Sequence, residues 1–174
     1  CVSQMRVADV VVAARHAQVV KIVTARPGPT SKSDCLNNIL EAIERFEETN
    51  GVRFEIVAMH DAEDFVHPSE LLLFNYLLPR VDAIQVPILP MPTPHHEFVH
   101  WSYADEFAIN HMNDIIAREH TSGFVPFAGT GMAFSRRALR FMQEKIGQKL
   151  FQDGALTEDY SMGKKMHDAG LTVV

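Results

Sequence analysis

Three carboxylates within four residues follow a strongly apolar segment of the chain. Asp61, Glu63 and Asp64 come soon after the run FEIVAM, residues 54–59. In an extended backbone the side chains of Asp61 and Glu63 point to one face, where their charges repel unless a cation lies between them. Hard divalent ions such as Mg²⁺ and Mn²⁺ take oxygen ligands of this kind.

Two interpretations of this acidic cluster stay open from these residues alone. In the first, Asp61 and Glu63 hold a divalent ion, and Asp64 is a third ligand, a neighbouring partner of the ligands, or a side chain that faces solvent. In the second, the cluster is a solvated acidic turn that also caps the following helix.

A second acidic cluster, Thr157-Glu158-Asp159, precedes a short helical pattern. Thr157 suits the N-cap of this helix, and the helix dipole favours the ionised form of Asp159 in its first turn. An ionised carboxylate is ready to accept a proton at neutral pH, as a general base does. The alternative is that these acidic residues only stabilise the first turn of the helix.

A glycine-flanked segment, GTG at residues 129–131, follows the apolar run 124–128. Glycine lets the backbone approach a ligand closely, although the same residues also make plain turns. A few residues later, Arg136 and Arg137 are expected either to pair with phosphate or nearby acids or to face solvent.

Nine histidines invite comparison with zinc sites. His95, His96 and His100 cluster near a proline-rich loop, and His60 precedes the acidic cluster. The segment HEFVH (96–100) has the H-E-x-x-H spacing, but it adjoins that loop, and the chain has no C-x-x-C spacing. We therefore expect no zinc site. Trp101 is expected either to stack on a sugar or to anchor its helix to the core.

The composition indicates one globular domain without a nucleic-acid surface. The chain has 174 residues and a net charge of −6, whereas binding to a phosphate backbone needs a basic excess. Its two cysteines make no disulfide framework, which favours a reducing compartment. No run reaches the roughly 18 apolar residues that span a bilayer. Because the chain begins at Cys1 and ends within a strand pattern, we expect a soluble piece of a longer protein.

Apolar runs alternate with helical patterns, and these elements must position the residues above. Strands are expected at 18–25, 53–64, 81–88 and 171–174, and on both sides of the GTG segment. Helices are expected after a capping box at 31–34, at 67–79, after the second GTG strand, and before a C-terminal cap at Gly170. A further long amphipathic helix places one set of side chains on a single side: Tyr103, Phe107, His111, Ile115 and Ile116.

This alternation predicts an α/β layered fold with a mainly parallel sheet flanked by helices. In such sheets ligands bind at the carboxyl ends of the strands. The acidic cluster at 61–64 lies at that place in the predicted fold.

Four segments, in order along the chain, resemble the processive family 2 glycosyltransferases, the cellulose-synthase-like group. TSKSDCLN (30–37) is similar to the family's K-A-x-x-L-N segment, and HDAED (60–64) is similar to its D-x-D metal motif. FAGTGMAFSRRAL (127–139) is similar to G-T-x-x-x-x-R-R-x-A-L, and TEDYSMGKKMHDAGLTV (157–173) to T-E-D-x-x-L-x-x-R-L-x-x-x-G. Within the group, ARPGPTSKSDCLNN and HDAEDFVHPSELLLFNYL resemble the glycosyltransferase-like domain of bacterial inner-membrane proteins of the phage-adsorption protein B type.

The resemblance implies a Rossmann-like GT-A fold, with residues 1–174 as a single domain truncated at both ends. It implies inverting transfer of a sugar from a nucleotide sugar, such as a UDP-sugar, to a saccharide acceptor. Glu63 departs from the family pattern, because it keeps the charge of Asp but lengthens the arm. The implied site residues are, for Mg²⁺ or Mn²⁺, Asp61, Glu63 and Asp64; for the donor, Lys32 and Asp61; for the acceptor, Gly129, Thr130 and Thr157; and for catalysis, Asp159 as general base, and Glu158.

The same resemblance implies parts that lie outside these residues. A strand with the acid that reads uridine is expected before Cys1, and a Q-x-x-R-W segment after Val174, so the isolated piece is expected to be inactive or nearly so. The longer protein is expected to be embedded in the bacterial inner membrane, with this domain at the cytoplasmic face. Two alternatives stay open: a non-catalytic scaffold in envelope polysaccharide export or phage adsorption, and a metal-dependent phosphoesterase that uses His60, Asp61 and Asp64.

Overall fold

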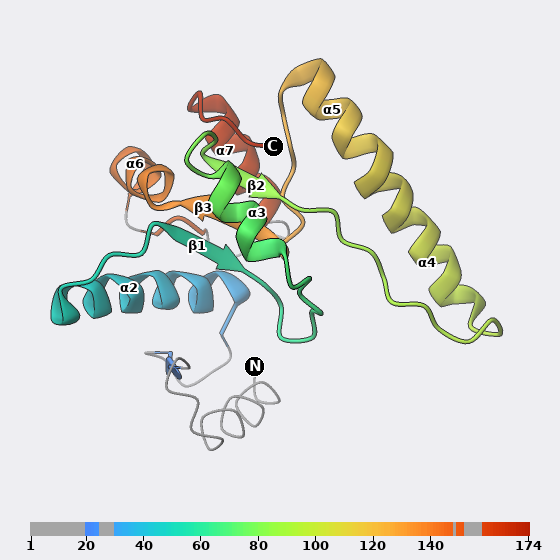
Figure 1. Cartoon of the computed structure of the whole chain (residues 1–174), viewed down its shortest axis with the longest axis horizontal. Coiled ribbons are helices and arrows are strands. Elements are labelled where there is room, and N and C mark those ends of the chain that lie inside the picture. Colours follow the sequence, from blue (N-terminus) through green and yellow to red (C-terminus); the bar gives the residue numbers. More distant parts are fainter. Residues whose placement is uncertain (1–19, 25–29, 148, 152–157) are drawn as a thin grey trace.

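Helices and strands alternate along the part of the chain that the structure describes. The computed structural model describes residues 20–24, 30–147, 149–151 and 158–174 (Figure 1). The elements, in chain order, are α2 (Lys32–Asn50), β1 (Ile56–Met59), α3 (Glu70–Leu77), β2 (Ala83–Gln85), α4 (Phe98–Ile109), the π-helical turn η1 (Asn110–Asp114), α5 (Ile115–Ser122), β3 (Met132–Ser135), α6 (Arg136–Ile146) and α7 (Glu158–Asp168).

The three strands form one sheet in the order β1-β3-β2. Both neighbouring pairs are antiparallel, and Ala133 of β3 lies opposite Ala58 of β1 on one side and Ile84 of β2 on the other. β1 and β2 therefore run in the same direction, and β3 runs against both. Beyond β2, the end of the chain adds a short parallel contact in which Val173 bridges Ala83.

The predicted mainly parallel sheet is thus not confirmed in the described residues. The prediction assumed that each strand follows a helical crossover, which makes neighbouring strands parallel. β3 instead leaves the glycine segment 129–131 and inserts, reversed, between two strands that share one direction. The alternation of helices and strands itself agrees with the prediction.

Helices cover both faces of the sheet. Side chains alternate across a strand, so the neighbours Ala133 and Phe134 point to opposite faces. Phe134 belongs to a buried cluster with residues of α2, α6 and α7, among them Leu40 and Met166. Ala133 belongs to a second buried cluster with Phe74 of α3. The result is a layered α/β core with the sheet in the middle.

The first predicted helix forms as α2 and is capped at both ends. The Ser31 side chain accepts a hydrogen bond from the Asp34 backbone N–H at 3.0 Å. Gly51 closes the other end with a left-handed φ of 64°, a conformation that suits glycine. The N-cap confirms the predicted start of the helix and places Lys32 at its first turn.

The other helix boundaries agree with the prediction to within a few residues. α3 begins at Glu70, so Pro68 lies just before the helix rather than in its first turn, and the helix ends before Pro79. α7 ends at Asp168, and Gly170 follows with a φ of 79°, as a C-terminal cap.

Four strand predictions are too long or wrong. Residues 20–24, the described part of the predicted strand 18–25, form no strand, and Val20 and Val23 are exposed. β1 and β2 occupy only the middle of the predicted ranges 53–64 and 81–88. Residues 124–128 are also not a strand, although Val125 and Phe127 are buried, and Pro126 between them has no N–H to give to a ladder.

The long amphipathic helix forms as α4, η1 and α5, which stand beside the sheet, away from α2 and α6 (Figure 1). Along its predicted face, Phe107 lies next to Tyr103 and His111, with 4.5 and 5.4 Å between ring centroids. Ile115 is buried but Ile116 is exposed, because neighbouring residues on a helix point in directions about 100° apart. None of the helices in the described ranges is long and apolar enough to cross a lipid bilayer.

Candidate active site

The acidic cluster is a turn at the end of β1. The strand stops at Met59, and residues 62 and 63 are in a turn rather than in extended backbone. The Asp64 N–H donates to the Asp61 carbonyl oxygen at 3.2 Å, and the Asp61 N–H donates to Asp64 Oδ2 at 2.9 Å. The expectation that Asp61 and Glu63 share one strand face is therefore wrong. The turn pairs Asp61 with Asp64 instead.

Thr130 of the glycine segment fastens this acidic turn. Its hydroxyl accepts a hydrogen bond from the Asp61 N–H at 3.1 Å and donates to Asp64 Oδ2. Asp61 and Thr130 are 69 positions apart in sequence. The two segments that sequence patterns singled out separately thus meet at one edge of the sheet.

Lys32 reaches the same place from the first turn of α2. Its ammonium lies 2.7 Å from Asp61 Oδ1 and donates to the Gly129 carbonyl oxygen at 2.8 Å. The side chains of Lys32 and Asp61 are each more than one-third exposed, so the pair is open to solvent and to ligands. Lys32 therefore bridges the acidic turn and the glycine segment with a positive charge.

Asp159 completes the group from the first turn of α7. Gly129 has a φ of 83°, and a Cβ added there would lie 2.6 Å from Asp159 Oδ2 and 3.3 Å from Lys32 Nζ. The Asp159 carboxylate thus packs on the glycine backbone beside the lysine ammonium. Its other oxygen, Oδ1, accepts a hydrogen bond from the Tyr160 N–H at 2.7 Å.

Gln85 supports the glycine segment, and sequence reasoning missed it. It is buried at the end of β2, where its side-chain oxygen accepts from the Ala128 N–H at 2.8 Å. Its amide nitrogen donates to the Thr130 carbonyl oxygen at 3.0 Å. The available signal was a polar residue inside the apolar run AIQVPI, since buried polar groups in proteins are nearly always hydrogen-bonded.

A cleft of about 490 Å³ opens over the acidic turn, within the range of small-molecule sites. One end is polar and carries Asp61, Glu63 and Asp64, with Glu63 exposed. The other end is mostly apolar, formed by the segment 86–91 and by Tyr103 and Phe107 of α4. The arrangement suits a ligand whose charged part meets the acidic turn.

The histidines do not build a zinc site in the described residues. His60 Nε2 lies 2.7 Å from Glu70 Oε1, an ion-pair distance without hydrogen-bond angles, and its Nδ1 lies 3.5 Å from Asp64 Oδ2. His95 is exposed and stacks on Trp101, so Trp101 anchors the proline-rich loop to α4. Across the described ranges, no group of three or more His, Cys, Asp or Glu is placed to hold a metal ion.

The acidic turn nevertheless fits Mg²⁺ or Mn²⁺ by the chemistry of its donors. Asp61, Glu63 and Asp64 offer hard carboxylate oxygens at one end of the cleft. Mg²⁺ is commonly bound through only one or two carboxylates plus substrate phosphates, so a closed protein cage is not required. Asp64 Oδ2 already accepts hydrogen bonds from the Asp61 N–H and the Thr130 hydroxyl, and Asp61 Oδ1 lies 2.7 Å from the Lys32 ammonium, so a metal ion on Asp61 would have to displace that lysine.

The structure describes one predicted site residue, Glu158, only in part and another, Thr157, not at all. Glu158 is the first residue of α7. Thr157, the predicted N-cap and acceptor ligand, lies outside the described residues.

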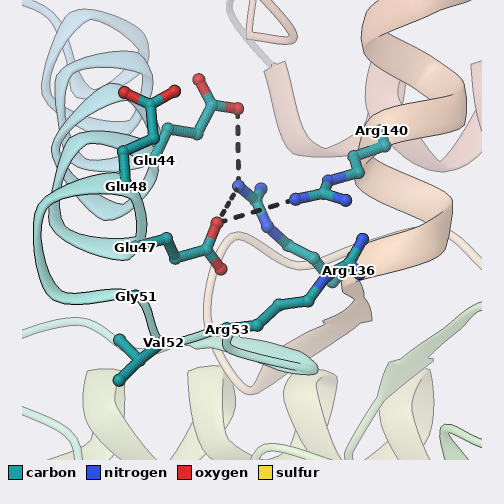
Figure 2. Close-up of a pocket in the computed structure, with 8 residues that line it drawn as sticks. All are labelled: Glu44, Glu47, Glu48, Gly51, Val52, Arg53, Arg136 and Arg140. Atoms are coloured by element: carbon teal, nitrogen blue, oxygen red, sulfur yellow. Dashed lines mark hydrogen bonds and ion pairs between the residues drawn. The ribbon is translucent and has the colours of Figure 1, made fainter.

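A second cavity, of about 520 Å³, lies between the C-terminal part of α2 and α6 (Figure 2). Arg136 is buried there, and its Nη2 lies 2.9 Å from Glu47 Oε2 and 3.5 Å from Glu44 Oε1. Arg140 also approaches Glu47, at 3.8 Å. This cavity shares no lining residue with the cleft, and the ion pairs of Arg136 and Arg140 with Glu44 and Glu47 join α2 to α6 there.

Hydrogen bonds decide how readily the buried Glu47 carboxyl ionises. Burial of the Glu47 carboxyl opposes ionisation, but hydrogen bonds from Arg136 and the Phe54 N–H, together with nearby arginine charges, outweigh it and lower the pKa of Glu47. Arg137, the next residue after Arg136, pairs with Asp82 at 2.6 Å. Both arginines thus pair with acids, which was one of the two expectations.

Comparison with known proteins gives a consistent picture. Residues 56–174 match the family model described as glycosyl transferase family group 2. The chain is 45% identical over 163 residues to "Bacteriophage adsorption protein B" of Escherichia coli (strain K12), and equally to "Bacteriophage N4 adsorption protein B" of E. coli O157:H7. The alignments cover 94% of this chain but 22% of each relative, so the chain spans about a fifth of their length. No solved structure matches.

Proposed function

The chain belongs to glycosyl transferase family group 2, and we propose that it is the core of an inverting glycosyltransferase. The single observation that carries the proposal is the convergence of Lys32, Asp61 and Asp159 around the Gly129 backbone. A cation, a candidate metal ligand and a candidate base thus meet around one glycine, and of these Asp61 also lines the cleft. Family membership supports glycosyl transfer, and this geometry supports the roles given below.

The donor in this proposal is a nucleoside-diphosphate sugar, such as a UDP-sugar, at the polar end of the cleft. Asp61 and Glu63 would hold Mg²⁺ or Mn²⁺, and Asp64 would keep the turn in shape through its bonds with Thr130 and the Asp61 N–H. A bound divalent cation supplies charge neutralisation at the diphosphate leaving group, so no separate general acid is required. Lys32 adds a further positive charge for the phosphates.

Asp159 is the general base of the proposal. It would take the proton from an acceptor hydroxyl as that oxygen bonds to the anomeric carbon of the sugar. The bond from the anomeric carbon to the diphosphate oxygen breaks at the same time, and its electron pair leaves with the diphosphate. Attack from the face opposite the leaving group inverts the configuration. Glu158 precedes Asp159 in chain order and is proposed to assist it.

The acceptor is proposed to be a saccharide that lies against the glycine segment, with Gly129, Thr130 and Thr157 as its contacts. Gly129 presents backbone rather than side chain beside Asp159, and the carboxylate takes up the space that a Cβ would fill. We place the complete protein at the cytoplasmic face of a bacterial inner membrane, where nucleotide sugars are available.

A second candidate is a non-catalytic scaffold in phage adsorption or polysaccharide export. The names of the two relatives favour it, since both are phage adsorption proteins. The hydrogen-bonded lysine on Asp61 also favours it, because this pair satisfies the carboxylate without any ligand.

A calorimetric titration of UDP, with and without Mn²⁺, separates the two candidates. The complete wild-type protein is expected to bind UDP with Mn²⁺ present, and Asp61→Asn in the same protein to weaken this binding by roughly 10- to 100-fold, as losses around metal sites do. Asp105→Asn, on the exposed side of α4, is the matched control and should bind as wild type does. Absence of UDP binding in wild type would favour the scaffold.

A further inference from the structure

Lys32 occupies the carboxylate that the proposed metal would need. Its ammonium is 2.7 Å from Asp61 Oδ1, close enough to be the first neighbour of that oxygen. A divalent cation on the same oxygen would sit at about 2.0–2.1 Å from it, as Mg²⁺ does. The two positive charges would then be close neighbours and repel each other.

Two further neighbours, the Gly129 carbonyl oxygen and the Asp159 carboxylate, explain why the Lys32 ammonium stays beside Asp61. The same ammonium donates to the Gly129 carbonyl oxygen at 2.8 Å, and it lies beside the Asp159 carboxylate across Gly129. One lysine therefore offsets part of the negative charge of the acidic turn and ties the turn to the glycine segment. A divalent ion between these segments would have the same two effects: it would offset negative charge and join the turn to the glycine segment.

We propose that Lys32 is an internal stand-in cation, which keeps divalent metal off Asp61 until a diphosphate is bound. The inference rests on the proposed function and concerns the order in which ligands bind. Negative phosphate oxygens at the polar end of the cleft give the ammonium another partner. Lys32 then releases Asp61 to the metal, so metal and diphosphate bind cooperatively.

The side chain has the freedom that this role requires. Lys32 is more than one-third exposed, and a lysine ammonium is a point charge on a flexible stem. Asp61 keeps its backbone position when the lysine leaves, because its N–H is held separately by Thr130 and Asp64. The turn is thus preserved while its counter-ion changes.

In the first test, Mn²⁺ alone is titrated into the complete protein. Binding is monitored through the electron paramagnetic resonance signal of free Mn²⁺. Lys32→Met is expected to bind Mn²⁺ at least about fivefold more tightly than wild type, the lower end of typical coupling between ligands. Lys145→Met, which removes an exposed lysine on α6, is the matched control and should leave the affinity unchanged. A merely structural role for Lys32 predicts the opposite sign, since a loosened turn binds metal less well.

The second test repeats the Mn²⁺ titration at saturating UDP. In wild type, UDP should raise the Mn²⁺ affinity, and by reciprocity Mn²⁺ should raise the UDP affinity by the same factor. In Lys32→Met this factor should shrink by at least about fivefold, because the metal no longer needs the diphosphate to displace a competitor.

The outcomes distinguish this inference from the proposed function. If wild type binds Mn²⁺ and UDP together but Lys32→Met binds Mn²⁺ alone no more tightly than wild type, the stand-in role is refuted and the glycosyltransferase proposal stands. If wild type binds no UDP, the glycosyltransferase proposal fails, while the Mn²⁺-only comparison still decides the role of Lys32. Lys32→Gln, which keeps a donor for the Gly129 carbonyl, replaces Lys32→Met if the latter does not fold.

Discussion

The carboxylate of Asp159 packs on the backbone of Gly129 so closely that a methyl group there would lie 2.6 Å from Oδ2. The contact joins the first turn of α7 to the segment that leads into β3. The Gly129 carbonyl oxygen also accepts a hydrogen bond from Lys32, which pairs with Asp61. Gly129 therefore joins the acidic cluster at 61–64 and the cluster at 157–159 into one site.

Gly129→Ala should therefore displace Asp159. Its backbone has a φ of 83°, so alanine suffers left-handed strain of about 1–2 kcal/mol, plus roughly 1–3 kcal/mol from overpacking against the carboxylate. Gly123→Ala is the matched control: its φ is 65° and nothing lies within 4 Å, so only the strain applies. Urea unfolding measures both, and equal losses in the two variants would contradict the packing of Asp159 on Gly129.

Thr130→Val should loosen the acidic turn. The Asp61 N–H and Asp64 Oδ2 each lose a hydrogen bond to the hydroxyl, which costs about 1–3 kcal/mol of unfolding free energy and weakens Mn²⁺ binding. Thr130→Ser should recover both. Thr121→Val, at an exposed hydroxyl on α5, should change stability by less than about 0.5 kcal/mol. Unchanged stability in Thr130→Val would show that the hydroxyl does not hold the turn.

These contacts indicate which parts of the site were readable from the sequence. The pattern of an apolar run followed by Asp61 and Asp64 located the turn at a strand end, because a buried strand must leave the core into solvent. The prediction that Asp61 and Glu63 face the same side was wrong. It assumed that side chains alternate as in an extended strand, but the strand has already ended at Met59. The position of Glu63 in an exposed turn follows from that early end.

Other parts of the molecule could not be read because they depend on distant residues. The direction of β3 is set by its insertion between β1 and β2, which no local pattern encodes. Gln85 acts on the glycine segment 45 positions later in the chain. The contact of Lys32 with Asp61 spans 29 positions, so the resemblance suggested a role for the lysine but not its partner.

Arg136→Met should destabilise the protein strongly. It leaves the buried Glu47 carboxylate without its main partner, a loss that typically costs about 3–5 kcal/mol. Arg137→Met removes the same charge one residue later, from an arginine that is 76% exposed, and should cost about 1 kcal/mol or less. Chemical denaturation compares the two, and similar losses would mean that the Arg136–Glu47 pair does not fasten α2 to α6.

His111 should make stability depend on pH. Burial alone lowers the pKa of this histidine below its ordinary value of 6.5, so the folded state resists protonation. A depressed folded pKa means that stability is full above 6.5 and falls as pH drops through and below that value. His111→Phe, which keeps a ring beside Phe107, should flatten the profile between about pH 7 and pH 5. His120→Phe serves as the control on α5, and an unchanged profile in His111→Phe would contradict the prediction.

The most direct test of the account is sugar transfer by Asp159→Asn in the complete protein, measured as nucleoside diphosphate released from a panel of nucleotide sugars. Loss of the base should lower turnover by about 10²- to 10⁴-fold. Binding of UDP and Mn²⁺ should persist, because neither requires this carboxylate in the proposal. Asp168→Asn, at the exposed end of the same helix, should transfer sugar as wild type does. Turnover of Asp159→Asn at the wild-type rate would contradict the central claim.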